Sequence, residues 1–129
     1  MIIIGDRLIP YEETFYISSI DEISNTKPNS TLLFEYDENI LKYCFENCLL
    51  FGVVTNSLKE SIYANSLQAR YIICSNTLDK KIQDIAENYM FDSKVLSIID
   101  SSEQIESVAM NKIDGVIYKD LLGKSWKIY

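Results

Sequence analysis

Short apolar segments, rich in β-branched and aromatic residues, alternate along this chain with longer segments whose apolar residues recur at helical spacing. The apolar segments are Thr31–Tyr36, Leu49–Val54, Arg70–Cys74, Lys94–Ile99 and Gly115–Tyr118. Because parallel neighbours in a sheet need a long crossover, usually a helix, this alternation is typical of an α/β fold. Strands buried on both faces carry continuous apolar runs, as these segments do. The sequence therefore predicts a parallel sheet covered by helices.

The helical segments begin with residues that can cap them. Asp37 precedes a segment that extends to about Asn47. Two further segments open on capping-box pairs, Ser57 with Glu60 and Ser101 with Gln104. The clearest helix is the third, whose apolar residues fall on one narrow arc: Leu78, Ile82, Ile85, Ala86 and Tyr89.

A chain of 129 residues is expected to form one domain, residues 1–129. We predict a three-layer open sheet of five or six mainly parallel strands flanked by helices. A flavodoxin-like, doubly wound sheet and a half-barrel-like sheet both fit the pattern. Residues 1–30 are predicted to form a small N-terminal hairpin around Gly5–Asp6 and a first βα unit, with a strand at Thr14–Ser18 and a helix at Ile20–Asn25. Repeated βα units follow over residues 31–118. Residues 119–129 form a basic aromatic tail with a last strand at Ser125–Tyr129.

The charge of the chain is acidic and uneven. Residues 1–118 carry 9 basic and 18 acidic residues, a net charge of −9, whereas residues 119–129 carry 3 and 1, or +2. Nucleic acid is not an expected partner, because neutralising phosphates needs clustered Lys and Arg. The longest apolar run, Leu49–Val54, is too short for a membrane span. Three cysteines without export features predict reduced thiols and a cytoplasmic protein.

Polar residues follow the predicted strands, where parallel α/β folds bind their ligands. The candidate ligand-binding residues are Glu35, Asp37, Asn56, Ser75, Asn76, Asp100, Ser101 and Lys119. The helix starts nearby, with free N–H groups, favour a small anionic ligand at this edge. No cofactor is expected. The alternative is a Mg²⁺ site formed by Glu35, Asp37 and Asp100, since Mg²⁺ takes oxygen ligands. Several of the same residues also suit helix caps.

Three of these residues resemble, in part, the site of response-regulator receiver domains. Glu35 and Asp37 match that family's acidic pair, and Lys119 matches its lysine after the fifth strand. Ser75 and its neighbours stand where the family has its phospho-accepting aspartate, and Asp100 stands where it has a switch serine or threonine. The resemblance therefore implies a receiver-like scaffold that is not phosphorylated.

The chain has no histidine, no nucleophile motif and no glycine-rich phosphate loop. Catalysis of the familiar kinds is therefore not expected. The sequence predicts a small binding or interaction module, which presents the strand-end edge to an anionic ligand or its helices and tail to a protein partner. A Mg²⁺-dependent enzyme and a receiver-like domain are the alternatives. Terminal aromatic residues such as Tyr11, Tyr16 and Trp126 favour a protein partner or a homodimer.

Overall fold

The computed structural model describes residues 1–123, which form one sheet of seven strands. All six strand pairs within it are parallel. The strands are β1 (Ile2–Ile4), β2 (Thr14–Tyr16), β3 (Thr31–Glu35), β4 (Phe51–Val54), β5 (Tyr71–Cys74), β6 (Lys94–Ile99) and β7 (Gly115–Tyr118). The α/β fold and the parallel sheet are confirmed. The strand number exceeds the predicted five or six because two short strands, β1 and β2, extend the edges.

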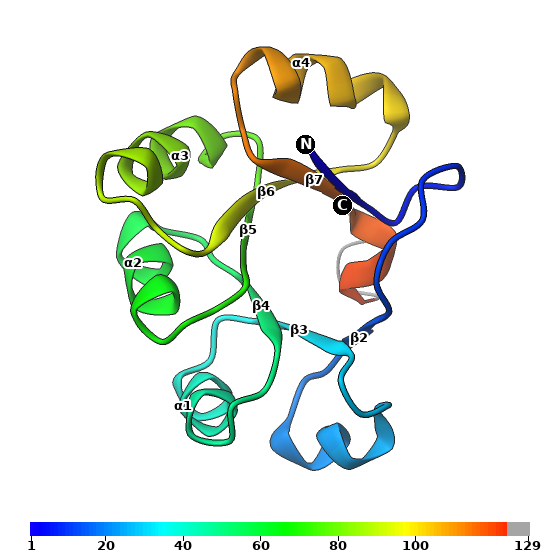
Figure 1. The fold of residues 1–129 in the computed structure, drawn as a ribbon, viewed down its shortest axis with the longest axis vertical. Coiled ribbons are helices and arrows are strands. Elements are labelled where there is room, and N and C mark those ends of the chain that lie inside the picture. The colour runs from blue at the N-terminus through cyan, green and yellow to red at the C-terminus, as the bar shows by residue number, and fades with distance from the viewer. Residues whose placement is uncertain (124–129) are drawn as a thin grey trace.

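The sheet is curled into a half-barrel. Its order is β1-β7-β6-β5-β4-β3-β2, so β2 to β7 lie in chain order. Right-handed crossovers between consecutive strands place each helix on the same face. Figure 1 shows all four α-helices outside the curled sheet. They are α1 (Glu38–Glu46), α2 (Leu58–Ser66), α3 (Asp79–Asn88) and α4 (Ile105–Met110). The half-barrel alternative is therefore confirmed, and the doubly wound sheet, with helices on both faces, is not formed.

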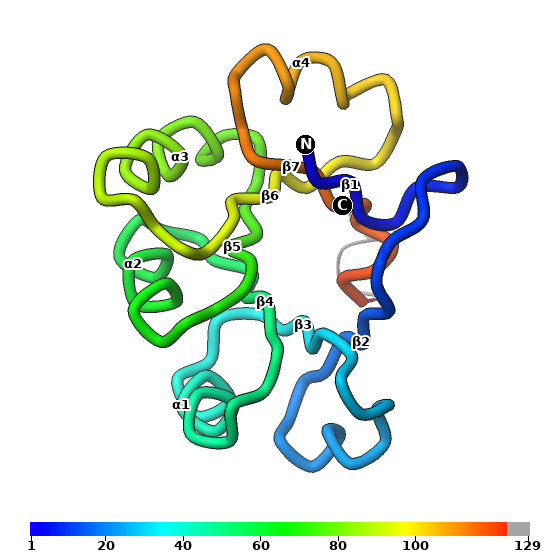
Figure 2. Tube along the Cα trace, in the orientation of Figure 1, coloured from blue at the N-terminus to red at the C-terminus, as the bar shows by residue number. Residues whose placement is uncertain are grey.

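The N-terminal hairpin is not formed. β1 pairs in parallel with β7, and residues 5–13, here called the strap, contain no second strand. The reason is local, because the Asp6 carboxylate accepts the N–H groups of Leu8 and Ile9 and turns the chain. The strap then runs to β2 at the other edge of the sheet, on the side opposite β4 and β5 (Figure 2). It bridges the open side of the half-barrel.

Apolar residues fill both faces of the sheet. The outer cluster joins strand residues such as Phe34 and Ile72 to the helices, for example through Ile82 of α3. The inner cluster fills the concave face with strand residues such as Leu33, Tyr71 and Leu96. Leu122 of the short 3-10 helix η3 (Lys119–Leu122) completes this inner cluster. The fold thus has two layers, and the strap and η3 cover its open side.

Gly115 shows how tightly the sheet curls. A Cβ atom at this position would lie 2.7 Å from Ile2 Cβ and 2.8 Å from Leu96 Cδ2, and it would also clash with the Ile2 carbonyl. A larger residue would therefore push β1 away from β7.

Two further 3-10 helices complete the described chain, η1 (Ile20–Asn25) and η2 (Ser102–Gln104). The first is the helix predicted at Ile20–Asn25. Within residues 1–123 no helix has both the length and the apolar content to cross a membrane. The strand predicted at Ser125–Tyr129 lies outside the described residues.

Candidate functional site

The predicted ligand-binding residues lie along the edge of the sheet where the strands end, called here the carboxyl edge. Most of them are engaged by their own loops. Asp37 caps α1, accepting the N–H groups of Asn39 at 2.9 Å and Ile40 at 3.1 Å. Ser101 caps η2 within a complete capping box with Gln104. The helix-cap alternative is therefore what the structure shows for Asp37 and Ser101.

The remaining predicted residues do not converge on one point. Ser75 Oγ lies 2.7 Å from Thr77 Oγ1, two residues along the same loop. Asn56 and Asn76 are exposed in the loops after β4 and β5, and Glu35 is exposed at the end of β3. Only Asp100 and Lys119 meet across two strands, with Lys119 Nζ 3.5 Å from Asp100 Oδ2.

This ion pair lies beside an open pocket of about 450 Å³ at the ends of β1, β6 and β7. The size is that of a small-molecule site. Its lining residues come from the start of the strap, from the loop after β6 and the start of η2, and from the end of β7 and η3: Gly5, Asp6, Arg7, Leu8, Asp100, Ser102, Tyr118 and Asp120. We call it the carboxyl-edge pocket. Of the predicted residues, Asp100 lines it directly and Lys119 is paired with that residue.

Asp6 is the best-connected side chain of the pocket. Its Oδ1 accepts the Tyr118 hydroxyl at 2.6 Å, and its Oδ2 accepts the N–H groups of Leu8 at 2.8 Å and Ile9 at 3.2 Å. The Tyr118 hydrogen bond is the main cause that lowers the pKa of Asp6, and the same bond raises the pKa of Tyr118. At neutral pH the pair is therefore a carboxylate and a neutral phenol. From the sequence, Asp6 follows the apolar run Met1–Ile4 and is expected in a hairpin turn at Gly5–Asp6, not in a site.

Of the four charged side chains that line the pocket, two already have partners. Asp6 is satisfied by three donors, and Asp100 is neutralised by Lys119. Within residues 1–123, Arg7 and Asp120 form no ion pair. The pocket therefore offers one exposed guanidinium and one exposed carboxylate to a ligand.

The carboxylates proposed for Mg²⁺ are not assembled. Asp37 uses its Oδ1 on two helix N–H groups, and Asp100 faces Lys119. Across the described residues, no three His, Cys, Asp or Glu side chains are grouped as metal ligands. The geometry gives no site at which Glu35, Asp37 and Asp100 act together.

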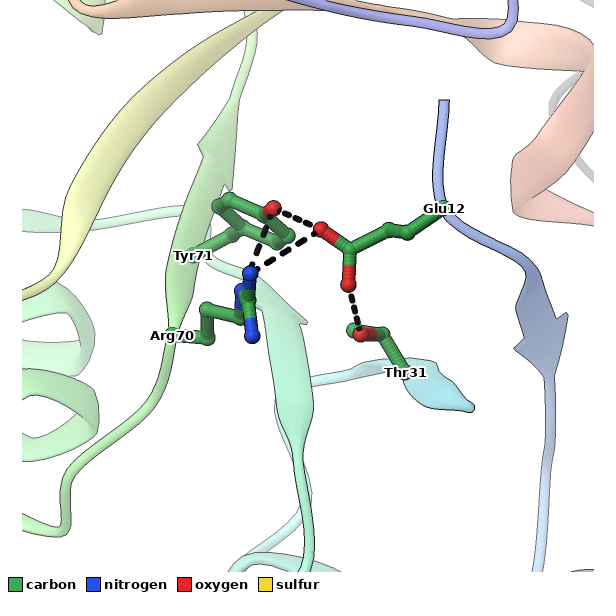
Figure 3. Close-up of polar contacts among 4 residues, drawn as sticks. All are labelled: Glu12, Thr31, Arg70 and Tyr71. Atoms are coloured by element: carbon green, nitrogen blue, oxygen red, sulfur yellow. Dashed lines mark hydrogen bonds and ion pairs between the residues drawn. The ribbon is translucent and has the colours of Figure 1, made fainter. Parts of the chain in front are cut away.

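A second polar cluster lies at the opposite edge, where the strands begin (Figure 3). Glu12 of the strap accepts hydrogen bonds from the hydroxyls of Tyr71 and, at 2.5 Å, of Thr31. Its Oε1 also lies 3.3 Å from Arg70 Nη2, and Arg70 Nε donates to the Tyr71 hydroxyl at 3.2 Å. Burial raises the pKa of Tyr71, and the hydrogen bond to Glu12 adds to this. The cluster fastens the far end of the strap to β3 and β5, and it was not predicted.

Comparison with known proteins identifies no relative. No family model matches the chain, and a search of curated proteins finds no match. The strand order also differs from that of receiver domains, which are doubly wound.

Proposed function

We propose that the protein is a small binding module, and that the carboxyl-edge pocket takes a ligand bearing an anionic group. The observation that carries this is Arg7, an exposed guanidinium with no ion pair in residues 1–123 at the mouth of the pocket. A guanidinium binds a carboxylate or phosphate through two parallel hydrogen bonds. The Ser102 hydroxyl and the Asp120 carboxylate, which also line the pocket, suit hydroxyl or amino groups on the same ligand.

The titration behaviour of the pocket supports binding rather than proton transfer. The two shifted pKa values in the pocket move away from pH 7, because the pKa of Asp6 is lowered and that of Tyr118 is raised. A general acid or base works best with a pKa near the working pH. Asp6 and Tyr118 therefore do not suit that role.

Substitution of Arg7 tests the proposal. Inorganic phosphate and glycerate are titrated into ¹⁵N-labelled protein, and amide shifts are followed for residues 5–8 and around Ser102. Arg7→Gln should weaken binding about 10- to 100-fold, the effect of losing a charge-assisted hydrogen bond of about 1.5–3 kcal/mol. Lys81→Gln, an exposed lysine on α3, is the charge-matched control and should leave binding unchanged.

Two results would contradict the proposal. One is the absence of shifts in the pocket with either anion, and the other is an equal loss of affinity in both variants. Shifts induced by Mg²⁺ and confined to Glu35, Asp37 and Asp100 would instead favour the enzyme alternative.

The compartment and the oligomeric state stay predictions. All three cysteines are free, with Cys44 and Cys74 buried and Cys48 exposed. Free thiols suit a reducing compartment such as the cytoplasm. Within residues 1–123 the outer edges of β1 and β2 pair with no further strand, which supports the expected homodimer, since exposed strand edges invite pairing.

A further inference from the structure

On the outer face of the half-barrel, α1 and α2 stand apart (Figure 1). Residues of both helices and the residues next to them line a groove of about 420 Å³. Its apolar lining is formed by Tyr36, Leu41, Phe45, Tyr63 and Leu67. The groove is separate from the carboxyl-edge pocket, and the inference drawn from it does not depend on the function proposed above. We call it the α1–α2 groove.

Packing against the sheet does not account for the aromatic residues of this groove. α1 already buries Ile40, Leu41 and Cys44 against the sheet, and α2 packs there through the small residues Ser61 and Ala64. Phe45 and Tyr63 flank these stripes and keep 39% and 46% of their surface exposed. Exposed aromatic residues around a groove are typical of binding surfaces.

The charges along α1 select the occupant. Glu38, Lys42 and Glu46 line the groove at four-residue intervals, so they form one stripe along the helix. The two carboxylates are about 12 Å apart along the axis, given a rise of about 1.5 Å per residue. Lys42 lies between them and adds its methylene stem to the apolar wall. A ligand that enters the groove therefore meets a carboxylate at each end.

One ring of the aromatic wall already faces a cation of its own chain. Lys59 Nζ lies 5.7 Å from the centroid of the Tyr63 ring, within the range of a cation–π contact. The net charge of −9 over residues 1–118 draws basic partners to the molecule.

We propose that the α1–α2 groove binds a basic amphipathic helix of another protein. Bulky apolar residues at i, i+3 or i+4, and i+7 of that helix pack between Phe45 and Tyr63. Lys or Arg residues about two turns apart pair with Glu38 and Glu46. A third helix between two outer helices follows ordinary helix packing.

Two peptides of identical leucine pattern test this inference, one with lysines and the other with glutamates flanking the apolar stripe. Binding to the whole chain is measured by isothermal titration and by ¹⁵N shifts of α1 and α2. The leucine–lysine peptide should bind at least about tenfold more tightly than the leucine–glutamate peptide. Phe45→Ala with Tyr63→Ala should weaken its binding at least about tenfold, as for aromatic anchors of interfaces.

Two further variants keep the test independent of folding effects. Glu38→Gln with Glu46→Gln changes only exposed positions and should bring the two peptides to similar affinity. Tyr89→Ala removes an exposed aromatic residue beyond the end of α3 and should change nothing. Equal affinity of both peptides for the natural protein, or shifts away from α1 and α2, would overturn the inference. Concentration-dependent shifts of the groove without peptide would also overturn it, because they would identify a second copy as the occupant.

Discussion

The polar residues that matter most in this fold have partners far away in the chain. Asp79, the first residue of α3, is buried, and its Oδ2 accepts the buried Ser97 hydroxyl of β6 at 2.8 Å. Burial, with the charge of Asp79 second, raises the pKa of the neighbouring Cys74 thiol to about 12. That thiol is therefore unreactive at neutral pH. From sequence, Asp79 cannot be told from the solvent-facing carboxylates of the same helix, because Ser97 lies 18 residues away.

Removal of the Ser97 hydroxyl should destabilise the protein. Ser97→Ala leaves the buried Asp79 side chain without this donor, which costs about 1–3 kcal/mol for a buried acceptor left unsatisfied. Urea unfolding measures the change, and Ser66→Ala, at an exposed position of α2, is the matched control, with an expected change within about 0.5 kcal/mol. Equal stability of the two variants would show that Asp79 does not depend on Ser97.

The sequence predicts the edge at which a site would lie but not which residues meet there, because those residues are far apart in the chain. The carboxyl edge follows from parallel strands, and Asp100 and Lys119 form an ion pair there. Asp6 and Arg7 were missed because their place depends on β1 pairing with β7, more than 100 residues along the chain. Glu12 was missed because Tyr71, its partner, is 59 residues away.

At the scale of elements, helix starts were predicted well because capping is local. Asp37, Ser57 and Ser101 each accept N–H groups of the turns they precede. Helix ends gave no comparable signal, since none carries the glycine that usually marks them. Two residues beyond the end of each α-helix the chain instead has a non-glycine residue with positive φ: Cys48 (55°), Gln68 (67°), Met90 (51°) and Lys112 (61°). The N–H of the following residue then returns to a helix carbonyl, as from Phe91 to Ala86 at 2.8 Å.

Glycine at one of these positions should stabilise the protein. Met90 is 84% exposed, so Met90→Gly removes left-handed strain of about 1–2 kcal/mol with little loss of packing. The greater freedom of glycine in the unfolded chain offsets part of this, which leaves a gain of about 0.5–1 kcal/mol.

The same substitution at Met110 is the control. Met110 is similarly exposed, at 79%, but it ends α4 with helical backbone, so Met110→Gly should cost about 0.5–1 kcal/mol. Thermal unfolding of both variants measures the difference. Destabilisation of similar size in both would contradict the left-handed cap as the source of strain.

At the scale of the molecule, the strap completes what the sheet leaves open. Seven strands curl only part of the way around, and residues 5–13 connect the two free edges. Asp6 holds one end of the strap to β7, and Glu12 holds the other to β3 and β5. Periodicity predicted the parallel sheet but not its curl, because both arrangements bury the same apolar runs. They differ in strand order and in whether the helices cover one face or both, and neither difference changes the periodicity. The strap itself has no periodicity, which left its course unpredicted.

The pH dependence of stability should reveal the Asp6 end of the strap. Folding lowers the pKa of Asp6, so its contribution is present above the ordinary carboxyl pKa of about 4 and is lost as the pH falls through the lower folded value. Folding raises the pKa of Tyr118, so that contribution is present below about pH 10 and is lost as the pH rises through the higher folded value. Because one hydrogen bond is the main cause of both shifts, Asp6→Asn should flatten the acid side of a plot of Tm against pH and also weaken the alkaline dependence. Tyr118→Phe should flatten the alkaline side and weaken the acid dependence, of which the Leu8 and Ile9 N–H groups maintain a part. Asp92→Asn, an exposed carboxylate in the loop after α3, should leave both sides as they are. If Asp6→Asn and Asp92→Asn changed the acid side equally, general charge rather than the attachment of the strap would determine the acid sensitivity of the fold.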